Sequence, residues 1–175
     1  MNEPELRNMM YTALGSGHPF MIRYPRGHGE GLPWRGEKFE ALPVGRGRRL
    51  REGDDVALVS VGTVGNAAAR AAERAAAEGV NAAHYDLRFV KPLDEALLDE
   101  VGRKFRRVVT VEDGALRGGV GEAVAAFFND RGYDVRVHRL GIGDEWVEHG
   151  TPGQLYALCG YDEEGILRAL LDTRA

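Results

Sequence analysis

Two arginines flank a tyrosine and a proline in the stretch MIRYPRG, residues 21–27, and their side chains are well suited to bind an anion. A guanidinium group is planar and presents several N–H donors, so it can bind two oxygens of one phosphate. Pro25 fixes the backbone between Arg23 and Arg26. The spacing fits both an anion site and a solvated strand end, and by itself it does not decide between them.

A second candidate is the glycine-rich stretch EDGALRGGVGEAV, residues 112–124. Its loop, residues 118–121, is spaced like the start of a dinucleotide-binding turn. Val124 stands where the third glycine should be, and Glu112, Asp113 and Glu122 surround the loop with negative charge. We therefore interpret the glycines as a tight turn between a strand and a helix, and we assign no metal site to the EDG stretch.

The histidines and the cysteine offer no further catalytic pattern. His84 and His138 fall within expected strands and are interpreted as structural, and no role is assigned to His28 or to His149 in its acidic loop. Cys159 has apolar neighbours, which indicates a buried thiol. Zinc-protease, serine-hydrolase and C-x-x-C motifs are all missing from the sequence. We expect this chain to carry no catalytic residue, no cofactor-binding residue and no metal ligand.

Composition narrows the class of protein. The 175 residues are 43% hydrophobic and 29% charged, and no apolar run approaches the roughly 18 residues of a membrane span. The net charge of −4 gives no reason to expect binding to nucleic acid or to an acidic membrane. The basic stretch at residues 46–51 is followed at once by acids and is interpreted as a solvated turn. A single cysteine and an N-terminus without an apolar segment favour a cytoplasmic protein.

The elements that must position these residues follow from the pattern of apolar residues. A helix is expected at residues 3–17 and a short strand at residues 19–25, before a stretch rich in glycine, proline and charge. Strands and helices then alternate. The expected strands are residues 55–63, 80–90, 106–113 and 133–142, and the expected helices are residues 64–79, 93–105, 121–132, 151–160 and 162–174.

This alternation predicts an α/β fold with three layers, in which a mostly parallel sheet has helices on both faces. One helix and one strand are too little to fold alone. We therefore expect residues 1–26 to be the tail of a preceding domain, residues 27–54 to be a linker, and residues 55–175 to be the α/β domain.

Several stretches, in this order, resemble one enzyme family. They are LRNMMYTAL (residues 6–14), IRYPRG (22–27), YDLRFVKPLDEALL (85–98), VTVEDGALRGGVGEAV (109–124) and LGIGDEWVEHGT (140–151). Together they resemble the C-terminal part of the 1-deoxy-D-xylulose-5-phosphate synthases, which are thiamine-diphosphate enzymes of the transketolase family. The resemblance covers nearly the whole chain and implies a transketolase C-terminal type of domain.

The resemblance implies a transferase that condenses pyruvate with D-glyceraldehyde 3-phosphate, releasing CO2, to give 1-deoxy-D-xylulose 5-phosphate for isoprenoid and thiamine biosynthesis. It implies thiamine diphosphate and magnesium in the full enzyme, both bound outside this chain, together with missing N-terminal domains and a homodimer to which this part contributes. Arg26 matches the family residue that binds the substrate phosphate, and Arg23 is expected to support it. The isolated chain is expected to be inactive.

Two alternatives stay open. The chain could be the matching part of a transketolase or of a 2-oxoacid dehydrogenase β subunit. It could also be a non-catalytic module for dimerisation or anion binding, although an independent domain would rarely begin with one helix and one strand of a neighbour.

Overall fold

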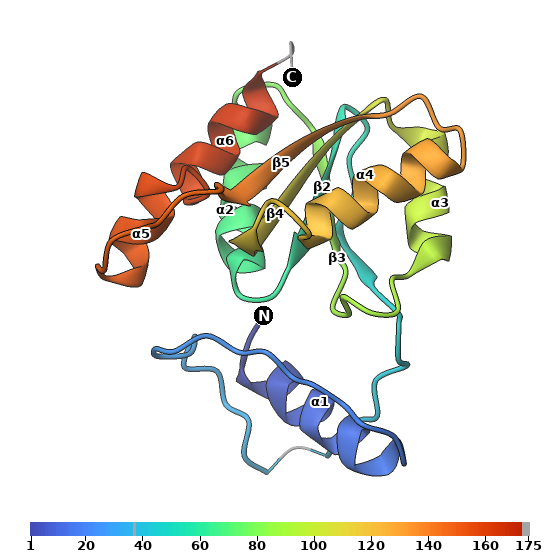
Figure 1. Cartoon of the computed structure of the whole chain (residues 1–175), viewed down its shortest axis with the longest axis vertical. Helices are drawn as coiled ribbons and strands as arrows, with labels where there is room; N and C mark the ends of the chain where they lie inside the picture. Colours follow the sequence, from blue (N-terminus) through green and yellow to red (C-terminus); the bar gives the residue numbers. More distant parts are fainter. Residues whose placement is uncertain (37, 173–175) are drawn as a thin grey trace.

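The computed structural model describes residues 1–36 and 38–172 of the chain. Helix α1 (Glu3–Gly15) comes first, and a long stretch without regular structure connects it to a sheet with helices around it (Figure 1). The strands are β1 (Arg48–Arg51), β2 (Val56–Val61), β3 (Ala82–Asp86), β4 (Arg107–Ala115) and β5 (Arg136–Ile142). The other helices are α2 (Val64–Ala77), α3 (Glu95–Lys104), α4 (Val120–Asp130), α5 (Pro152–Leu158) and α6 (Glu163–Leu171).

The sheet has the strand order β1-β3-β2-β4-β5. Strand β2 pairs in parallel with β3 and β4, and β4 pairs in parallel with β5. Strand β1 pairs antiparallel with β3 at one edge. Helices α2 and α6 pack on one face, and α3 and α4 pack on the other. The predicted α/β fold, with a mostly parallel sheet between two helical layers, is confirmed.

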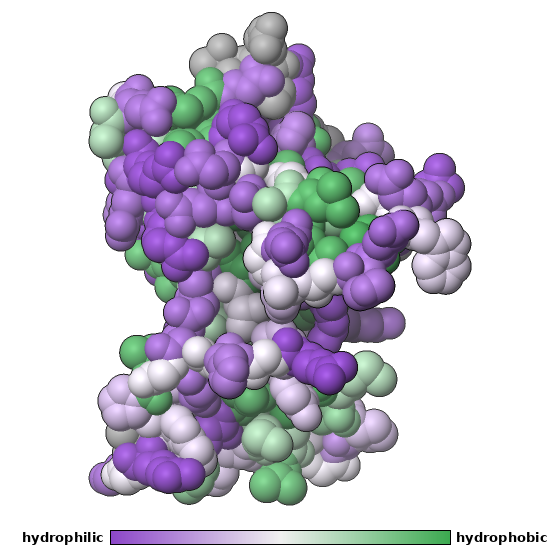
Figure 2. Space-filling view, turned by 90° about the vertical axis from the view of Figure 1, so that its left-hand side faces the viewer, coloured by the Kyte–Doolittle hydropathy of each residue, from purple (hydrophilic) through white to green (hydrophobic). Residues whose placement is uncertain are grey.

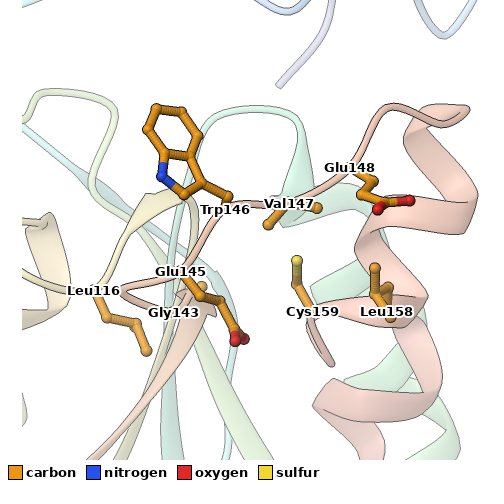
Figure 3. A pocket seen from close by; sticks show the side chains of 9 residues that line it. Leu116, Gly143, Glu145, Trp146, Val147, Glu148, Leu158 and Cys159 are labelled. Carbon is orange, nitrogen blue, oxygen red and sulfur yellow. The ribbon is translucent and has the colours of Figure 1, made fainter.

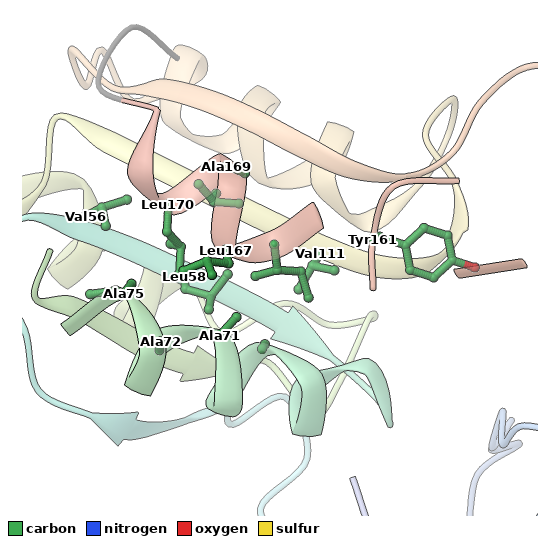
Figure 4. Packing of buried hydrophobic residues seen from close by; sticks show 14 of the residues in the cluster. Val56, Leu58, Ala71, Ala72, Ala75, Val111, Tyr161, Leu167, Ala169 and Leu170 are labelled. Atoms are coloured by element: carbon green, nitrogen blue, oxygen red, sulfur yellow. The ribbon is translucent and has the colours of Figure 1, made fainter. Parts of the chain in front are cut away.

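The central strand β2 is buried on both faces, which explains why its sequence is a continuous apolar run. Val56 and Leu58 face α2 and α6, whereas Ala57 and Val59 face α3 and α4. The buried side of α2 is made of alanines, so this helix can lie close to both the sheet and α6 (Figure 4). The two apolar layers fix the position of the sheet, and therefore of the loops at its carboxyl edge.

Two predictions about the N-terminal third are wrong. Residues 19–25 form no strand, and the backbone there lies in a loop. An isolated strand has no neighbour with which to pair its N–H and C=O groups, so an apolar alternation alone does not produce one. Conversely, β1 lies inside the stretch expected to contain no regular element. The division into a tail, a linker and a domain stays a prediction.

The other elements agree with the pattern apart from their ends. The helix expected at residues 162–174 begins at Glu163 and ends at Leu171, and residues 173–174 lie outside the described part of the chain. Strand β4 runs on to Ala115, two residues beyond its predicted end. Within residues 1–36 and 38–172, no helix is both long and apolar enough to cross a membrane.

A buried ionic cluster joins α1 to the sheet. Oε1 of Glu5 lies 2.9 Å from Nη2 of Arg48 and 2.7 Å from Nε of Arg88. The same Nη2 of Arg48 lies 3.0 Å from Oδ2 of Asp86 at the end of β3. Figure 2 shows the two parts of the molecule meeting at a narrower middle. Charged side chains therefore form much of the contact between α1 and the α/β part.

Candidate functional site

Both arginines of the RYPRG segment are exposed and lie in the loop that follows α1. Arg26 makes no hydrogen bond or ion pair with any residue in the described part of the chain. Its guanidinium group is therefore available to an anion. The prediction that Arg26 ends a strand is not met, because its backbone belongs to a loop.

Arg23 lies beside the carboxyl end of β4. A Cβ atom placed on Gly114 would be 3.9 Å from Nη1 of Arg23 and 3.1 Å from Oε2 of Glu112. The guanidinium group of Arg23 and the carboxylate of Glu112 therefore flank the same glycine. The structure thus brings a residue of the N-terminal loop to the edge of the sheet, about ninety positions away along the chain.

Glu112 caps the first turn of α4. Its carboxylate accepts hydrogen bonds from the backbone N–H groups of Val120, at 2.9 Å, and Gly121, at 2.8 Å. The free amides of a helix N-terminus are the groups that would otherwise bind a phosphate. Since Glu112 already occupies them with negative charge, the residues of this loop do not fit a diphosphate group. This geometry supports the interpretation of loop 118–121 as a tight turn, and Gly118 adopts a positive φ of 68° there.

Asp113, the next residue, is held by two tyrosines. Its carboxylate accepts hydrogen bonds from the hydroxyl of Tyr161, at 3.0 Å, and from that of Tyr156, at 3.3 Å. Burial raises the pKa of both tyrosines, and the charge of Asp113 raises it further. Both hydroxyls therefore stay protonated and donate to Asp113. The carboxylate of Asp113 is thereby held at the end of β4.

The N-terminal residues also contact the first turn of α2. The side-chain N–H2 of Asn66 donates to the backbone carbonyl of Met1, at 3.0 Å, and to Oε1 of Glu30, at 2.9 Å. Asn66 follows β2, the neighbour of β4 in the sheet. Segments on both sides of the RYPRG stretch therefore lie against the same edge of the sheet.

A pocket of about 490 Å³ opens beyond the ends of β4 and β5, next to α5 (Figure 3). Leu116, Val147, Leu158 and Cys159 line it together with two glutamates. Trp146 stands at its mouth with a fully exposed ring. Cys159 is only half-buried, so the expectation of a buried thiol is wrong. Its neighbours along the chain are apolar, but the residues around it leave the pocket open.

The remaining candidates take structural positions. His84 is buried in β3, where its Nε2 lies 2.8 Å from Oγ of Ser60. His28 and His149 are exposed in loops. Within residues 1–36 and 38–172, no three or more His, Cys, Asp or Glu side chains are grouped so that they could hold a metal ion.

Comparison with known proteins defines the family. Residues 45–166 match the family described as "Transketolase, C-terminal domain". The chain belongs to this family. The match includes the whole sheet and the first turn of α6, but it begins after the RYPRG segment. The transketolase C-terminal fold therefore supplies the sheet edge on which Arg23 lies, and the two arginines lie outside the matched residues.

Relatives of known name match almost the whole chain. It is 53% identical to a protein of Bacteroides fragilis and 43% identical to one of Symbiobacterium thermophilum, both named 1-deoxy-D-xylulose-5-phosphate synthase. These matches cover 99% and 94% of this chain, but only 27% and 25% of the relatives. The chain thus spans about a quarter of their length. Its resemblance to this synthase group within the transketolase family is confirmed.

A solved structure agrees with the fold. The "Split gene transketolase, inactive beta4 tetramer" superposes with a TM-score of 0.70 and is 34% identical over 75% of this chain and 43% of its own.

Sequence reasoning missed the groups near Arg23 at the end of β4. Asp113 is 43 positions from Tyr156 and 48 positions from Tyr161. No local spacing signals such a contact, since only the packing of α5 beside the sheet creates it.

Proposed function

We propose that this chain is the C-terminal portion of a 1-deoxy-D-xylulose-5-phosphate synthase. The complete enzyme would condense pyruvate with D-glyceraldehyde 3-phosphate, with loss of CO2, to form 1-deoxy-D-xylulose 5-phosphate. The observation that carries this proposal is the 53% identity over 99% of the chain, and Arg26, which is exposed and has no partner among the described residues, agrees with it. The product would serve isoprenoid and thiamine biosynthesis.

Arg26 is the group that we assign to the phosphate of glyceraldehyde 3-phosphate. Its guanidinium is exposed and has no partner among the described residues, so binding an anion would break no internal ion pair. An arginine binds two phosphate oxygens in a fixed geometry, which would hold the aldehyde carbon of the acceptor in place for attack. Arg23 supports this site from the neighbouring position.

Thiamine diphosphate and magnesium belong, in this proposal, to parts of the complete enzyme outside this chain. Thiamine diphosphate supplies the carbanion chemistry when bound. The one loop here that is spaced for a phosphate has its amides occupied by Glu112. We therefore expect the isolated chain not to bind the cofactor through this loop and to show no activity.

The larger assembly is also part of the proposal. N-terminal domains would complete the site around Arg26, residues 1–26 would end the second of them, and residues 27–54 would link it to the α/β domain at 55–175. We expect the enzyme to be a cytoplasmic homodimer. The exposed Trp146 and Leu158 beside the pocket lend the α/β domain an apolar surface for such contacts.

The test uses a complete synthase that contains this chain. Arg26→Ala should raise the KM for glyceraldehyde 3-phosphate by about tenfold to a hundredfold, because one charge-assisted phosphate contact contributes about 1.5–3 kcal/mol. The KM for pyruvate should hardly change. Arg35→Ala, which removes an exposed arginine stacked on Trp34, is the matched control. Unchanged constants for both substrates in Arg26→Ala would remove this residue from the site.

One alternative follows from the structural comparison. The likeness to the split-gene transketolase favours, as a second candidate, a part of a transketolase that takes a ketose phosphate as donor. The complete protein should be offered pyruvate or a ketose phosphate as the donor with the same acceptor. Product from pyruvate, and none from the ketose phosphate, would support the synthase. Product from the ketose phosphate would support the transketolase.

A further inference from the structure

Strands β2 and β4 form the topological switch point of the sheet, where the chain leaves two neighbouring strands toward opposite faces. These strands are parallel neighbours, with Val61 opposite Glu112 at their ends. From β2 the chain enters α2 on one face, and from β4 it enters α4 on the other face. The two loops therefore leave the sheet toward opposite faces. In open α/β sheets, ligands usually bind outside the carboxyl ends of the strands at such a point.

In this chain the protein's own N-terminal residues lie against both loops at this point. On the β2 side, Asn66 holds the carbonyl of Met1 and the carboxylate of Glu30. On the β4 side, the guanidinium group of Arg23 lies beside Gly114, with Nη1 3.9 Å from the position of a Cβ there. The residues around the RYPRG segment thus contact both the β2 side and the β4 side of this sheet edge. These polar contacts add to the ionic cluster of Glu5, Arg48 and Arg88 that joins α1 to the sheet.

The charges at the end of β4 explain why an arginine lies there. Glu112 and Asp113 are consecutive carboxylates, and in the described part of the chain neither has a basic group within 4.0 Å. The charge of Arg23 reaches this cluster, since it lowers the pKa of Tyr156 against the larger opposing effects of burial and of Asp113. Arg23 is thus a cation on the side of this acidic pair that faces the N-terminal loop.

We propose that Arg23 is a positioning residue rather than a phosphate ligand, and that Asp113, held by Tyr156 and Tyr161, is its partner. The attraction between Arg23 and the carboxylates at the end of β4 fixes the start of the RYPRG segment on the α/β domain. Arg26, three residues later and beyond Pro25, is then left free and oriented for the substrate phosphate. This inference rests on the function proposed for Arg26.

The two roles for Arg23 make different predictions for the substrate-free enzyme. A positioning residue acts before substrate binds, so Arg23→Met should increase amide hydrogen exchange in residues 19–30 of the complete protein. Asp113→Asn should do the same, because it keeps the shape of the side chain and removes its charge. A phosphate ligand would leave exchange in this segment unchanged without substrate. Asp144→Asn, which breaks an exposed ion pair with Arg117 near the same edge, is the control.

Steady-state kinetics on the complete synthase give the second readout. Asp113→Asn should raise the KM for glyceraldehyde 3-phosphate about tenfold, since a misplaced binding group is costly even when it is intact. The KM for unphosphorylated D-glyceraldehyde should not change. The double variant with Arg23→Met should be no worse than the worse of the two single variants, because each removes the same electrostatic attraction.

The outcomes separate this inference from the proposed function. If Arg26→Met raises the KM for the phosphorylated acceptor while Asp113→Asn leaves both the KM and hydrogen exchange unchanged, the function stands and the inference fails. Additive effects of Arg23→Met and Asp113→Asn would also overturn it, in favour of a direct contact between Arg23 and the phosphate. If Arg26→Met has no effect on this KM, the proposed function itself fails. If Asp113→Asn folds poorly, amide hydrogen exchange of residues 19–30 in Arg23→Met decides by itself whether Arg23 is a positioning residue or a phosphate ligand.

Discussion

At the scale of single residues, the sequence indicates candidate side chains but not their surroundings. The two arginines of RYPRG stand out because guanidinium groups rarely follow an apolar stretch so closely. What the sequence could not predict is that the two have different surroundings. Arg23 lies beside Gly114 and near the carboxylates of Glu112 and Asp113, whereas Arg26 has no partner in the described part. That difference arises from tertiary contacts between residues about ninety positions apart.

His84 is the residue whose charge should govern stability in acid. Burial, and then the charge of Arg48, lowers its pKa to about 4 from an ordinary value of 6.5. Its Nδ1 has no hydrogen-bond partner, so a proton there would add a buried, unpaired charge. Between pH 6.5 and 4 the unfolded state therefore binds more protons than the folded state, and stability should fall as the pH is lowered through this window.

The expected loss from His84 is up to about 3 kcal/mol of unfolding free energy, since one pKa unit corresponds to about 1.4 kcal/mol. Urea unfolding of this chain between pH 7 and pH 4 measures it. His84→Gln can keep the contact with Ser60 and should flatten the pH dependence, while the same substitution at His138 on β5 controls for the loss of a histidine. Equal slopes for the wild type and His84→Gln would show that His84 does not carry this effect.

At the scale of elements, the sequence predicted those whose apolar pattern reflects their own burial. The run at β2 is continuous because both faces are covered, and the alanines of α2 recur because one side packs against the sheet. The strand at residues 19–25 was predicted wrongly because its alternation has no partner strand here. β1 was missed because an edge strand can consist of charged residues and still pair through its backbone.

The turn after β1 gives a direct test of this edge pairing. A Cβ atom on Gly53 would lie 2.3 Å from backbone atoms of Ala82 and Ala83, at the start of β3. Gly53→Ala must therefore push the β1 turn away from β3, and it should lower the unfolding free energy by about 1–3 kcal/mol. Gly15→Ala is the control because the space around Gly15 is open.

Urea unfolding of the two glycine variants provides the comparison. The control should be neutral or slightly more stable, since alanine favours helix over glycine. A Gly53→Ala variant as stable as the wild type would mean that the turn after β1 is not packed against β3 as described.

At the scale of the whole molecule, the N-terminal part and the α/β part are joined by buried charges. Burial alone would raise the pKa of Glu5, but the hydrogen bond and charge of the amino terminus, with Arg48 and Arg88, outweigh it and lower the pKa. Glu5 is therefore a carboxylate between cations. Loss of one member of such a cluster leaves the other charges buried and unpaired.

Glu5→Gln should therefore loosen the attachment of α1 to the sheet. We expect amide hydrogen exchange across α1 to rise by about tenfold or more, while exchange in β2 and β4 stays slow, because removing a buried ion-pair partner costs about 3–5 kcal/mol. Arg70→Gln breaks an exposed ion pair with Glu163 and should change little. Equal exchange in α1 for Glu5→Gln and Arg70→Gln would contradict the role of the cluster.

The central claim is that this chain is a working part of a synthase, and complementation tests it most directly. The chain is mixed with a separately produced N-terminal remainder of such an enzyme, and product formation from pyruvate and glyceraldehyde 3-phosphate is followed with thiamine diphosphate and magnesium. We predict product only in the mixture, and much less of it when the chain carries Arg26→Ala. Stable association of the two parts without any product would contradict the claim and favour a non-catalytic role for the chain.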